Sequence, residues 1–344
     1  MTIRFYQPAE WHPHSACWLA FPSHVELWDD LLPAARAEFV ELCRAIADPD
    51  PVTGEARGEQ LEILVLDADG QAIAEQMLGT IPARFHHHAF GDIWMRDIAP
   101  IFLVHPTEGL ATVRFQFNGW GDRYHLPGDD TVAPAIARWV DAPEFTIALV
   151  AEGGALEVDG EGTCLTTRQC LLNPNRNPHL TQDEVERLLH MALGVSKVIW
   201  LQEGLLNDHT DGHIDTLARF VAPGVVVCME AQDPNDPNRD TLNQVATDLA
   251  KATDASGRRL HVIRIPSPGP VLDHQGNLMP ASYVNFYIGN RSVVVPTYGT
   301  AYDDAAVAAI ASCFPTRRTI GLSAKAILAG GGAFHCITQQ QPSV

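Results

Sequence analysis

One cysteine in the last segment of the chain has neighbours that suit a nucleophile. Cys336 follows three consecutive glycines at positions 330–332 and lies between a histidine and a β-branched isoleucine. Glycines allow the backbone to turn tightly or to approach a ligand closely, and attack by a cysteine requires an accessible thiolate. The alternative is that Cys336 is only a small apolar residue, as many single cysteines are.

A second group of polar residues with catalytic potential lies between positions 203 and 220. His213 and Asp215 are two positions apart, so in a strand their side chains would point to the same side. A carboxylate beside a histidine favours the charged imidazole and fixes its orientation, which suits a general acid and base. The same spacing also occurs in metal sites and in polar loops, so the pair alone leaves these alternatives open.

Other histidines and acids of the chain are less suited to catalysis. Adjacent side chains of a strand alternate between its faces, so His86, His87 and His88 cannot all converge on one metal ion. We expect these histidines to be solvated, like the run of acids and histidine at 208–211. A strand would also turn His335 away from Cys336, which makes this histidine a poor catalytic partner.

Asp97 and Glu152 stand beside tryptophan or glycine residues and lead into apolar segments. Burying a carboxylate is costly unless it meets a cation, and a guanidinium has the planar, forked donors that best match carboxylates. Three carboxylates, one histidine and one thiol brought together would suit attack of a thiolate on the carbon of a bound guanidinium. For any single acid, pairing with an internal arginine or lysine is the alternative.

The composition limits the class of protein. The 344 residues are 46% apolar and carry a formal net charge of −19, which fits a globular protein and argues against nucleic acid as a partner. An acidic cleft would instead attract a small cationic substrate. No apolar run is long enough to span a membrane. The N-terminus lacks a secretory signal and the seven scattered cysteines argue against disulfides, so we expect a cytoplasmic protein.

Helical and strand patterns alternate along the chain, which predicts an α/β fold. Thr181 and Glu184 form a capping box, followed by Gly194 as a stop, and they predict the most clearly marked helix. We expect helices within 22–48 and over 71–78, 131–140, 181–193, 240–253 and 303–313. We expect strands over 61–66, 98–104, 145–150, 197–201, 261–265 and 318–322, an apolar segment over 217–229 that is interrupted by Pro223 and Gly224, and a hairpin over 283–296.

Five polar segments recur at similar intervals, which predicts a repeating architecture. They are separated by 55, 61, 72 and 51 residues, and each follows a helix and a strand. Such recurrence indicates a repeat even where few residues are identical. Five units around an axis would bring the polar segments to the centre of one domain that covers residues 1–344. The segments are centred on Asp97, Glu152, His213, Asn285 and Cys336.

Several motifs, taken together, resemble one known family. They lie at 15–18, 94–97, 152–154, 173–178, 212–215, 296–299 and 330–340, in order across nearly the whole chain. In this combination they resemble the agmatine deiminases and the related bacterial-type peptidylarginine deiminases, within the superfamily of enzymes that modify guanidino groups. The resemblance implies a five-bladed α/β propeller of pseudo-fivefold symmetry, the pentein fold.

The resemblance also implies a mechanism of hydrolytic deimination. Cys336 would attack the guanidinium carbon, while Asp97 and Asp215 would bind the guanidinium nitrogens. Glu152 would support His213 and the bound cation. His213 would protonate the departing ammonia and then activate the water that cleaves the thiouronium intermediate.

Further expectations follow from the same resemblance. Trp94 and Asn285 would line the substrate pocket, no metal or organic cofactor is implied, and a homodimer is expected. Two segments depart from the family pattern: Ala333 and Phe334 replace Asn-Ile, and residues 208–211 read Asp-His-Thr-Asp in place of Asp-Glu-Thr-Asn. Phe334 could reshape the pocket, and the added charge of Asp211 could favour a substrate with a cationic tail.

The preferred function is hydrolysis of agmatine to N-carbamoylputrescine and ammonia, a step towards putrescine. The alternative substrates are peptidyl-arginine or another guanidino compound, and a substrate carboxylate would call for a nearby arginine. The candidates for that role are Arg114, Arg123 and Arg219. A metal-dependent hydrolase using His86 to His88 with His213 and Asp215 is an alternative of a different class. The last alternative is a protein that binds a guanidinium compound without turning it over.

Overall fold

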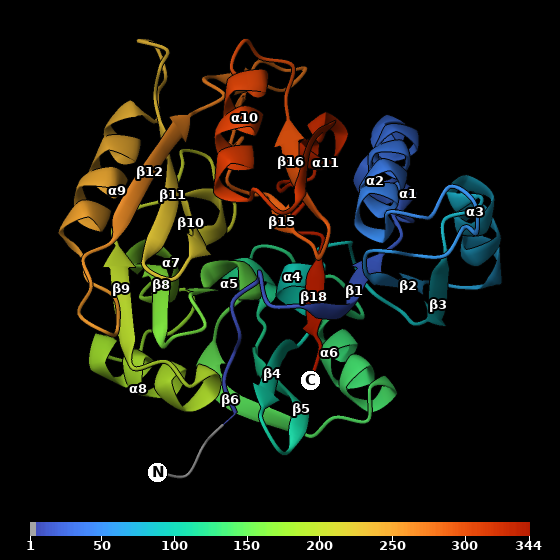
Figure 1. Cartoon of the computed structure of the whole chain (residues 1–344), viewed down its shortest axis with the longest axis horizontal. Helices are drawn as coiled ribbons and strands as arrows, with labels where there is room; N and C mark the ends of the chain where they lie inside the picture. The colour runs from blue at the N-terminus through green and yellow to red at the C-terminus, as the bar shows by residue number, and fades with distance from the viewer. Residues whose placement is uncertain (1–4) are drawn as a thin grey trace.

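A computed structural model describes residues 5–344 of the chain as an α/β protein, in which helices alternate with strands of short sheets (Figure 1). Its α-helices are α1 (Val25–Trp28), α2 (Leu32–Ala47), α3 (Ala68–Leu78), α4 (Met95–Ile98), α5 (Gly119–Asp122), α6 (Asp129–Trp139), α7 (Arg168–Leu171), α8 (Gln182–Leu193), α9 (Arg239–Lys251), α10 (Asp303–Cys313) and α11 (Lys325–Ala329). Three short 3₁₀ helices are η1 (Asp29–Leu31), η2 (Gly153–Ala155) and η3 (Ile214–Thr216). None of the helices in the described part of the chain is long and apolar enough to cross a membrane.

The strands form several small sheets rather than one large sheet. They are β1 (His14–Ala20), β2 (Gln60–Val65), β3 (Ala83–His87), β4 (Ile101–His105), β5 (Gly109–Gln116), β6 (Glu144–Val150), β7 (Glu157–Val158), β8 (Thr163–Thr167), β9 (Lys197–Leu201), β10 (Ala218–Ala222), β11 (Val225–Glu230), β12 (His261–Pro266), β13 (Val271–Leu272), β14 (Leu278–Met279), β15 (Tyr287–Ile288), β16 (Ser292–Thr297), β17 (Arg318–Ser323) and β18 (Gln339–Pro342).

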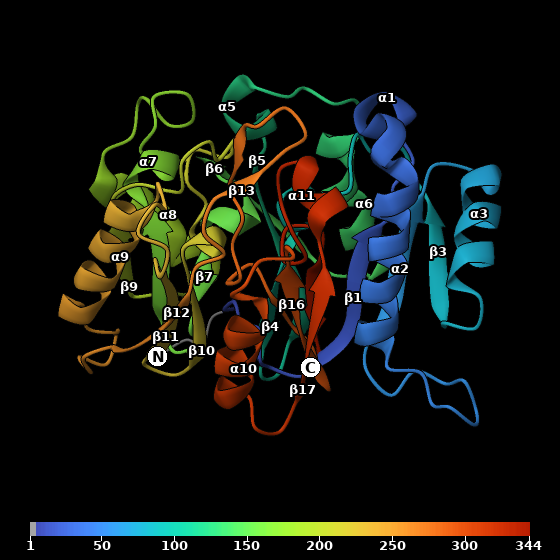
Figure 2. The same ribbon diagram turned by 90° about the horizontal axis from the view of Figure 1, so that it is seen from above.

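Five of these sheets share one pattern, an antiparallel pair followed by a strand that runs parallel to the second. Four of them are β4-β5-β6, β7-β8-β9, β10-β11-β12 and β15-β16-β17, and the fifth, β18-β1-β2-β3, adds one more parallel strand. Figure 1 shows the five sheets in chain order around the centre of the molecule. Figure 2 shows α8 and α9 along one side of the molecule and α2 and α3 along the other, with the strands between them.

The clearest helix signal of the sequence is confirmed in α8. The Thr181 hydroxyl accepts the N–H of Glu184, and the Glu184 carboxylate accepts the N–H of Thr181 at 2.8 Å, which completes the capping box. Gly194 ends the helix in the left-handed region, with φ of 71°. The amphipathic pattern of α2 is confirmed as well. Its buried face includes Leu32, Ala35, Phe39, Leu42, Cys43 and Ile46.

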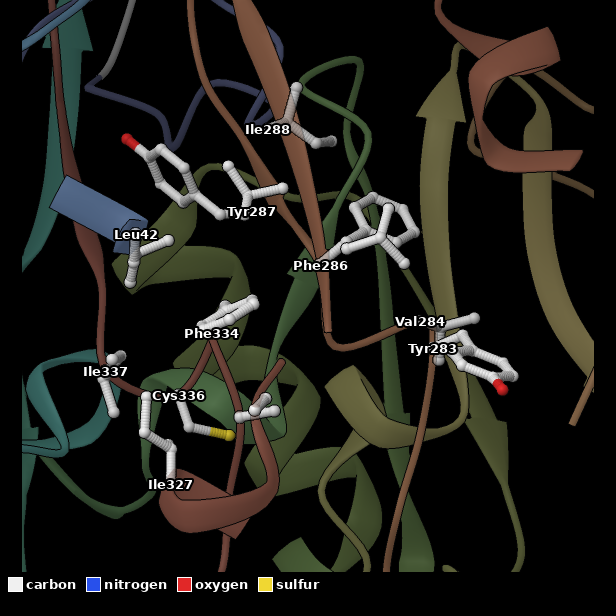
Figure 3. Close-up of a cluster of buried hydrophobic side chains, with 14 of the residues drawn as sticks. Leu42, Tyr283, Val284, Phe286, Tyr287, Ile288, Ile327, Phe334, Cys336 and Ile337 are labelled. Carbon is white, nitrogen blue, oxygen red and sulfur yellow. The ribbon is translucent and has the colours of Figure 1, made fainter. Parts of the chain in front are cut away.

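The C-terminal strand brings the two ends of the described chain together. β18 pairs antiparallel with β1, and Gln339 lies opposite Trp18. The predicted hairpin is also present, although its first arm is only β15, which pairs with β16. Residues 283–286, which precede β15, are buried in the hydrophobic core with Phe334 and Ile337 (Figure 3). The segment that contains Cys336 is therefore held on both sides, by the core and by β18.

Candidate active site

The predicted site residues come from connecting segments and short helices near the ends of strands. Asp97 lies in α4 and Glu152 precedes η2, whereas His213 and Asp215 lie just before and within η3. Cys336 lies in the turn that precedes β18. The side chains of Glu152, His213 and Asp215 are fully buried, and Cys336 keeps 7% of its surface exposed. The structure thus gathers these five residues from four distant parts of the chain.

The strand geometry considered for two pairs of site residues was wrong, and this changes which side chains can meet. His213 and Asp215 do not lie in a strand, and neither do His335 and Cys336, because β18 begins only at Gln339. In a turn, adjacent side chains need not alternate between two faces. His335 and Cys336 therefore both reach Asp215: the Oδ2 atom lies 2.7 Å from His335 Nδ1 and 3.6 Å from Cys336 Sγ.

The thiol of Cys336 is surrounded by polar acceptors and donors. Its Sγ lies 3.2 Å from Asn285 Nδ2 and 3.4 Å from Asn285 Oδ1, in addition to its contact with Asp215. Burial, followed by the charges of Asp215 and Asp97, raises the pKa of Cys336 well above its ordinary value. These surroundings therefore favour the protonated thiol over the thiolate.

The two aspartates that face the thiol are held in different ways. Asp97 accepts the N–H of Gly154 at 2.9 Å and the indole N–H of Trp120 at 2.8 Å, and burial raises its pKa. Burial also opposes ionisation of Asp215, but the hydrogen bond and charge of His335 outweigh it and lower the pKa of Asp215. The second oxygen of Asp215, Oδ1, is buried and has no hydrogen-bond partner among residues 5–344. It is a buried acceptor that remains free, whereas Oδ2 is the oxygen that contacts the thiol.

His213 lies between two carboxylates. Its Nδ1 is 3.9 Å from Asp97 Oδ1 and its Nε2 is 3.5 Å from Glu152 Oε2, distances of ion pairs rather than of good hydrogen bonds. Burial alone would lower the pKa of His213, but Asp97, Cys170 and Glu152 raise it well above its ordinary value. The acids around His213 thus favour its charged imidazolium form.

Glycines permit the close packing of this centre. A Cβ at Gly154 would lie 2.5 Å from His213 Nδ1 and 3.0 Å from Asp97 Oδ1, and a Cβ at Gly332 would lie 2.9 Å from Cys336 Sγ. Any larger residue would therefore push His213, Asp97 and Cys336 away from their present positions. The glycine run near the end of the sequence makes room for the thiol, as its position beside Cys336 indicated.

Sequence reasoning gave no role to Arg176, which lies within the motif at 173–178. Its Nε lies 3.0 Å from both carboxylate oxygens of Glu152, and its two other nitrogens contact Asp211 Oδ2 at 2.7 Å and Thr210 O at 2.8 Å. For Glu152, the internal arginine considered as an alternative is therefore what the structure shows. Although burial opposes it, contacts with His213 and Arg176 lower the pKa of Glu152.

The expectation that Asp211 is a solvated residue facing a cationic tail was wrong. Asp211 is buried and accepts hydrogen bonds from Arg123, Arg176 and Asn175. Burial opposes its ionisation, but these partners lower its pKa. Two arginines already balance its charge, so Asp211 fixes the loop at 208–211 instead of binding substrate.

A cavity of about 230 Å³ leads to the thiol. Its lining includes four tryptophan or tyrosine side chains, among them Trp94, in the position expected from the sequence. Asp97 and Cys336 lie on its lining, and no arginine or lysine of the described chain does. The other aromatic residues of the lining are Trp28, Trp120 and Tyr124. Asn285 was expected to line this pocket, but it lies behind the thiol, in contact with Cys336 Sγ.

The departure from the family pattern at Phe334 does not change this cavity. Phe334 is fully buried in the core and is absent from the cavity lining. Figure 3 shows its ring among Leu42, Tyr287 and Ile337. The other departure does reach the cavity, because His209 lies on its lining and contacts the hydroxyl of Tyr124 at 3.0 Å.

The three arginines considered for a substrate carboxylate are all paired elsewhere. Arg114 contacts Glu144 at 3.2 Å, Arg123 pairs with Asp211, and Arg219 is buried against Glu10 and Glu157. The cavity lining includes none of these arginines. The cavity therefore suits a substrate whose only strongly charged groups are cationic.

The three adjacent histidines do not form a metal site with His213. Their Nε2 atoms have separate partners, which are Glu62 for His86, Gln71 for His87 and Thr131 for His88. His86 is partly buried and stacks on Trp139 rather than being solvated. Within residues 5–344, the one group with metal-ligand spacing is Glu152, Cys170 and His213.

Comparisons with known proteins agree with this geometry. A family model for the Porphyromonas-type peptidyl-arginine deiminases matches residues 6–342. The agmatine deiminase of Stutzerimonas stutzeri is 37% identical over an alignment covering 98% of this chain and 96% of that protein. The agmatine deiminase of Medicago truncatula is 34% identical, with coverage of 99% and 97%. The solved structure of the agmatine deiminase of Enterococcus faecalis superposes with a TM-score of 0.89 at 31% identity, covering 98% and 96% of the two chains.

More distant structures share the fold alone. The DDAH of Pseudomonas aeruginosa superposes with a TM-score of 0.53 at 11% identity, and an amidinotransferase of Microseira wollei with a TM-score of 0.54 at 12% identity. Each alignment covers at least 95% of both chains. The α/β arrangement described above is therefore shared well beyond the relatives that are similar in sequence.

Proposed function

The chain belongs to the family of Porphyromonas-type peptidyl-arginine deiminases, and from this membership and the geometry of the site we propose that it hydrolyses agmatine to N-carbamoylputrescine and ammonia. One observation carries the proposal: the cavity that reaches Cys336 has aromatic walls and acidic groups at its end, without an arginine or lysine on its lining. The agmatine deiminases among its relatives support the same substrate.

The proposed substrate fits the charges of the cavity. Its guanidinium would lie between Asp97 and Asp215, whose Oδ1 is a free buried acceptor. Its alkyl chain would lie against Trp94 and the other aromatic walls. Free arginine would place a carboxylate where no cation balances it, which would cost binding energy. Arginine and arginyl peptides are therefore the less favoured substrates.

The first half of the proposed reaction forms a covalent intermediate. As the guanidinium binds, its positive charge offsets those of Asp97 and Asp215, and the Cys336 thiol loses its proton to solvent. The Sγ thiolate then attacks the guanidinium carbon and forms a C–S bond. His213 gives its proton to one terminal nitrogen, the C–N bond breaks, and ammonia leaves. An S-alkylthiouronium remains on Cys336.

The second half returns the enzyme to its initial state. His213, now neutral, takes a proton from a water molecule, whose oxygen attacks the same carbon. The C–S bond breaks, the electron pair returns to Sγ, the remaining hydroxyl proton passes to that sulfur to restore the thiol, and the ureido product leaves with the oxygen of that water. Glu152, held by Arg176, keeps His213 oriented through both steps. No oxidant, reductant or metal is needed to balance these steps.

The test is release of ammonia and ureido product from agmatine, arginine and an arginyl peptide, measured side by side with a chelator present. Turnover of agmatine with little turnover of the others would support the proposal. Turnover of a different guanidine would keep the chemistry and replace the substrate, whereas loss of activity with the chelator would favour a metal-dependent hydrolase. The Cys336→Ala variant should lose turnover but still bind agmatine, and turnover by this variant would contradict the thiolate mechanism.

We also propose that the five similar sheets are the blades of a five-bladed α/β propeller, the pentein fold, within one catalytic domain over residues 1–344. The repeated order of an antiparallel pair and a parallel strand supports this assignment. The role in putrescine formation, the cytoplasmic location and the homodimer stay predictions from the sequence.

A further inference from the structure

A buried chain of hydrogen bonds runs from the nucleophile to the N-terminal segment. Asp215 Oδ2 lies 3.6 Å from Cys336 Sγ and 2.7 Å from His335 Nδ1. The opposite ring nitrogen, His335 Nε2, lies 2.8 Å from Glu10 Oε2. At least 94% of the surface of His335 and Glu10 is buried. The mechanism derived above uses only the first two members of this chain, Cys336 and Asp215.

Glu10 is itself held firmly. Its Oε2 accepts a hydrogen bond from Arg219 at 2.6 Å and lies 3.6 Å from Arg96, and its Oε1 accepts the N–H of Ile288 at 2.7 Å. Arg219 is fixed in turn by Glu157 at 2.7 Å. These contacts fix Glu10, and through Glu10 they set the orientation of the His335 ring.

The hydrogen-bond pattern defines what His335 supplies. A carboxylate only accepts hydrogen bonds, and both ring nitrogens of a histidine donate only when the ring carries its positive charge. The contacts at 2.7 and 2.8 Å therefore assign both ring nitrogens of His335 as donors to carboxylate oxygens. Its Nδ1–H is bonded to Oδ2 of Asp215, the oxygen that also contacts Cys336 Sγ, and Oδ1 has no hydrogen-bond partner among residues 5–344.

We propose that His335, oriented by Glu10, is a positioning residue that fixes Asp215 beside Cys336 and keeps its carboxylate ionised for the guanidinium. The lowered pKa of Asp215, with the His335 hydrogen bond as the strongest effect opposing burial, agrees with this role. The charged groups that face this chain are Arg96, Arg219, Glu157 and His213. The inference rests on the proposed function only in assuming that the ligand is a guanidinium-like cation.

The test uses two alkylating reagents of almost the same shape, so that it does not depend on turnover of any substrate. 2-Chloroacetamidine carries a planar amidinium, whereas 2-chloroacetamide is neutral. The ratio of their rates at Cys336, located by mass spectrometry, measures how strongly ionised carboxylates attract a cation to the thiol. Failure of the proposed function would appear as absence of agmatine turnover, which leaves this ratio readable.

Two variants of one position separate charge from hydrogen bonding. The amide nitrogen of His335→Asn can still donate to Asp215 from near the Nδ1 position, whereas that of His335→Gln reaches only towards Glu10. We expect His335→Gln to lower the amidinium preference about tenfold, because Asp215 loses its hydrogen bond from His335. We also expect a change in how this ratio depends on pH. The acidic pH at which the amidinium preference is lost should be higher in His335→Gln than in the unaltered protein. His335→Asn should show a smaller loss. The proposal would be overturned if His335→Gln kept the amidinium preference of the unaltered protein and lost it at the same acidic pH.

A different measurement covers the case in which the variants do not fold. Glu10→Gln, which removes the charge behind Nε2, should shift the same ratio in the same direction. Neutron diffraction of the unaltered protein at neutral pH should show deuterium on both ring nitrogens of His335. Deuterium on only one nitrogen would overturn the proposal without any substitution.

Discussion

The Nε atom of Arg176 lies 3.0 Å from both carboxylate oxygens of Glu152, and this contact fixes the acid that faces His213. Both side chains of the pair are fully buried. Arg176 also contacts Asp211, so one guanidinium joins the catalytic centre to the loop at its rim. The site therefore depends on an arginine that touches none of the reacting atoms.

Replacing Arg176 should destabilise the fold. Arg176→Ala leaves Glu152 and Asp211 buried without their cation, and breaking a buried pair in this way costs about 3–5 kcal/mol. Urea unfolding measures the change in the free energy of unfolding. The control is Arg187→Ala, because Arg187 is exposed and forms a single ion pair within residues 5–344, with Glu184 at 3.7 Å. This control should change the free energy of unfolding by less than about 0.5 kcal/mol. Equal stability of the two variants would contradict the role of Arg176.

The thiol of Cys336 should ionise only at high pH in the free protein. Burial and the charges of Asp215 and Asp97 raise its pKa. The rate of its alkylation by neutral 2-chloroacetamide should therefore rise with pH, with a midpoint above about pH 8.5, the ordinary cysteine pKa. Because Asp97→Asn removes one negative charge, this variant should lower the midpoint. A small thiol in free solution is the control. A midpoint below that of the small thiol would contradict the expectation.

Removal of the charge at Asp97 should weaken catalysis strongly. Asp97→Asn keeps the size of the side chain but deletes a charge that would face the guanidinium, and truncating a buried charge pair costs about 2–5 kcal/mol. We therefore expect kcat/KM for agmatine to fall by about 30-fold to several thousand-fold. Asp304→Asn is the control, since Asp304 is exposed in α10. Near-normal kcat/KM in a folded Asp97→Asn protein would make Asp97 a structural residue.

Phe334 should matter for stability and not for substrate choice. It is fully buried in the core and does not line the cavity, so Phe334→Ala should cost about 3–5 kcal/mol of the free energy of unfolding. At temperatures well below unfolding, the KM for agmatine should change little. Phe145→Ala, at a position that is 43% exposed, is the matched control. A changed KM without loss of stability would instead place Phe334 in the pocket.

The sequence by itself was sufficient to predict the longer helices and to indicate candidate reactive groups. The capping box of Thr181 and Glu184 predicted where α8 begins, because its hydrogen bonds join residues three positions apart. The glycines beside Cys336 and the acids around His213 indicated the chemistry, because their residue types limit what they can do. Such local signals lie within one segment, and a single sequence displays them directly.

The tertiary structure decided which groups hold the reactive ones. Glu152 pairs with Arg176, 24 positions away, and His335 bonds to Glu10, 325 positions away. Hydrogen bonds between distant segments leave no periodic pattern in the sequence. The contact of His335 with Asp215 also depends on a turn where a strand was considered, because a strand would have directed His335 away from Cys336. Which buried charges balance one another is fixed only when the segments pack, because each pair must offset its own loss of hydration.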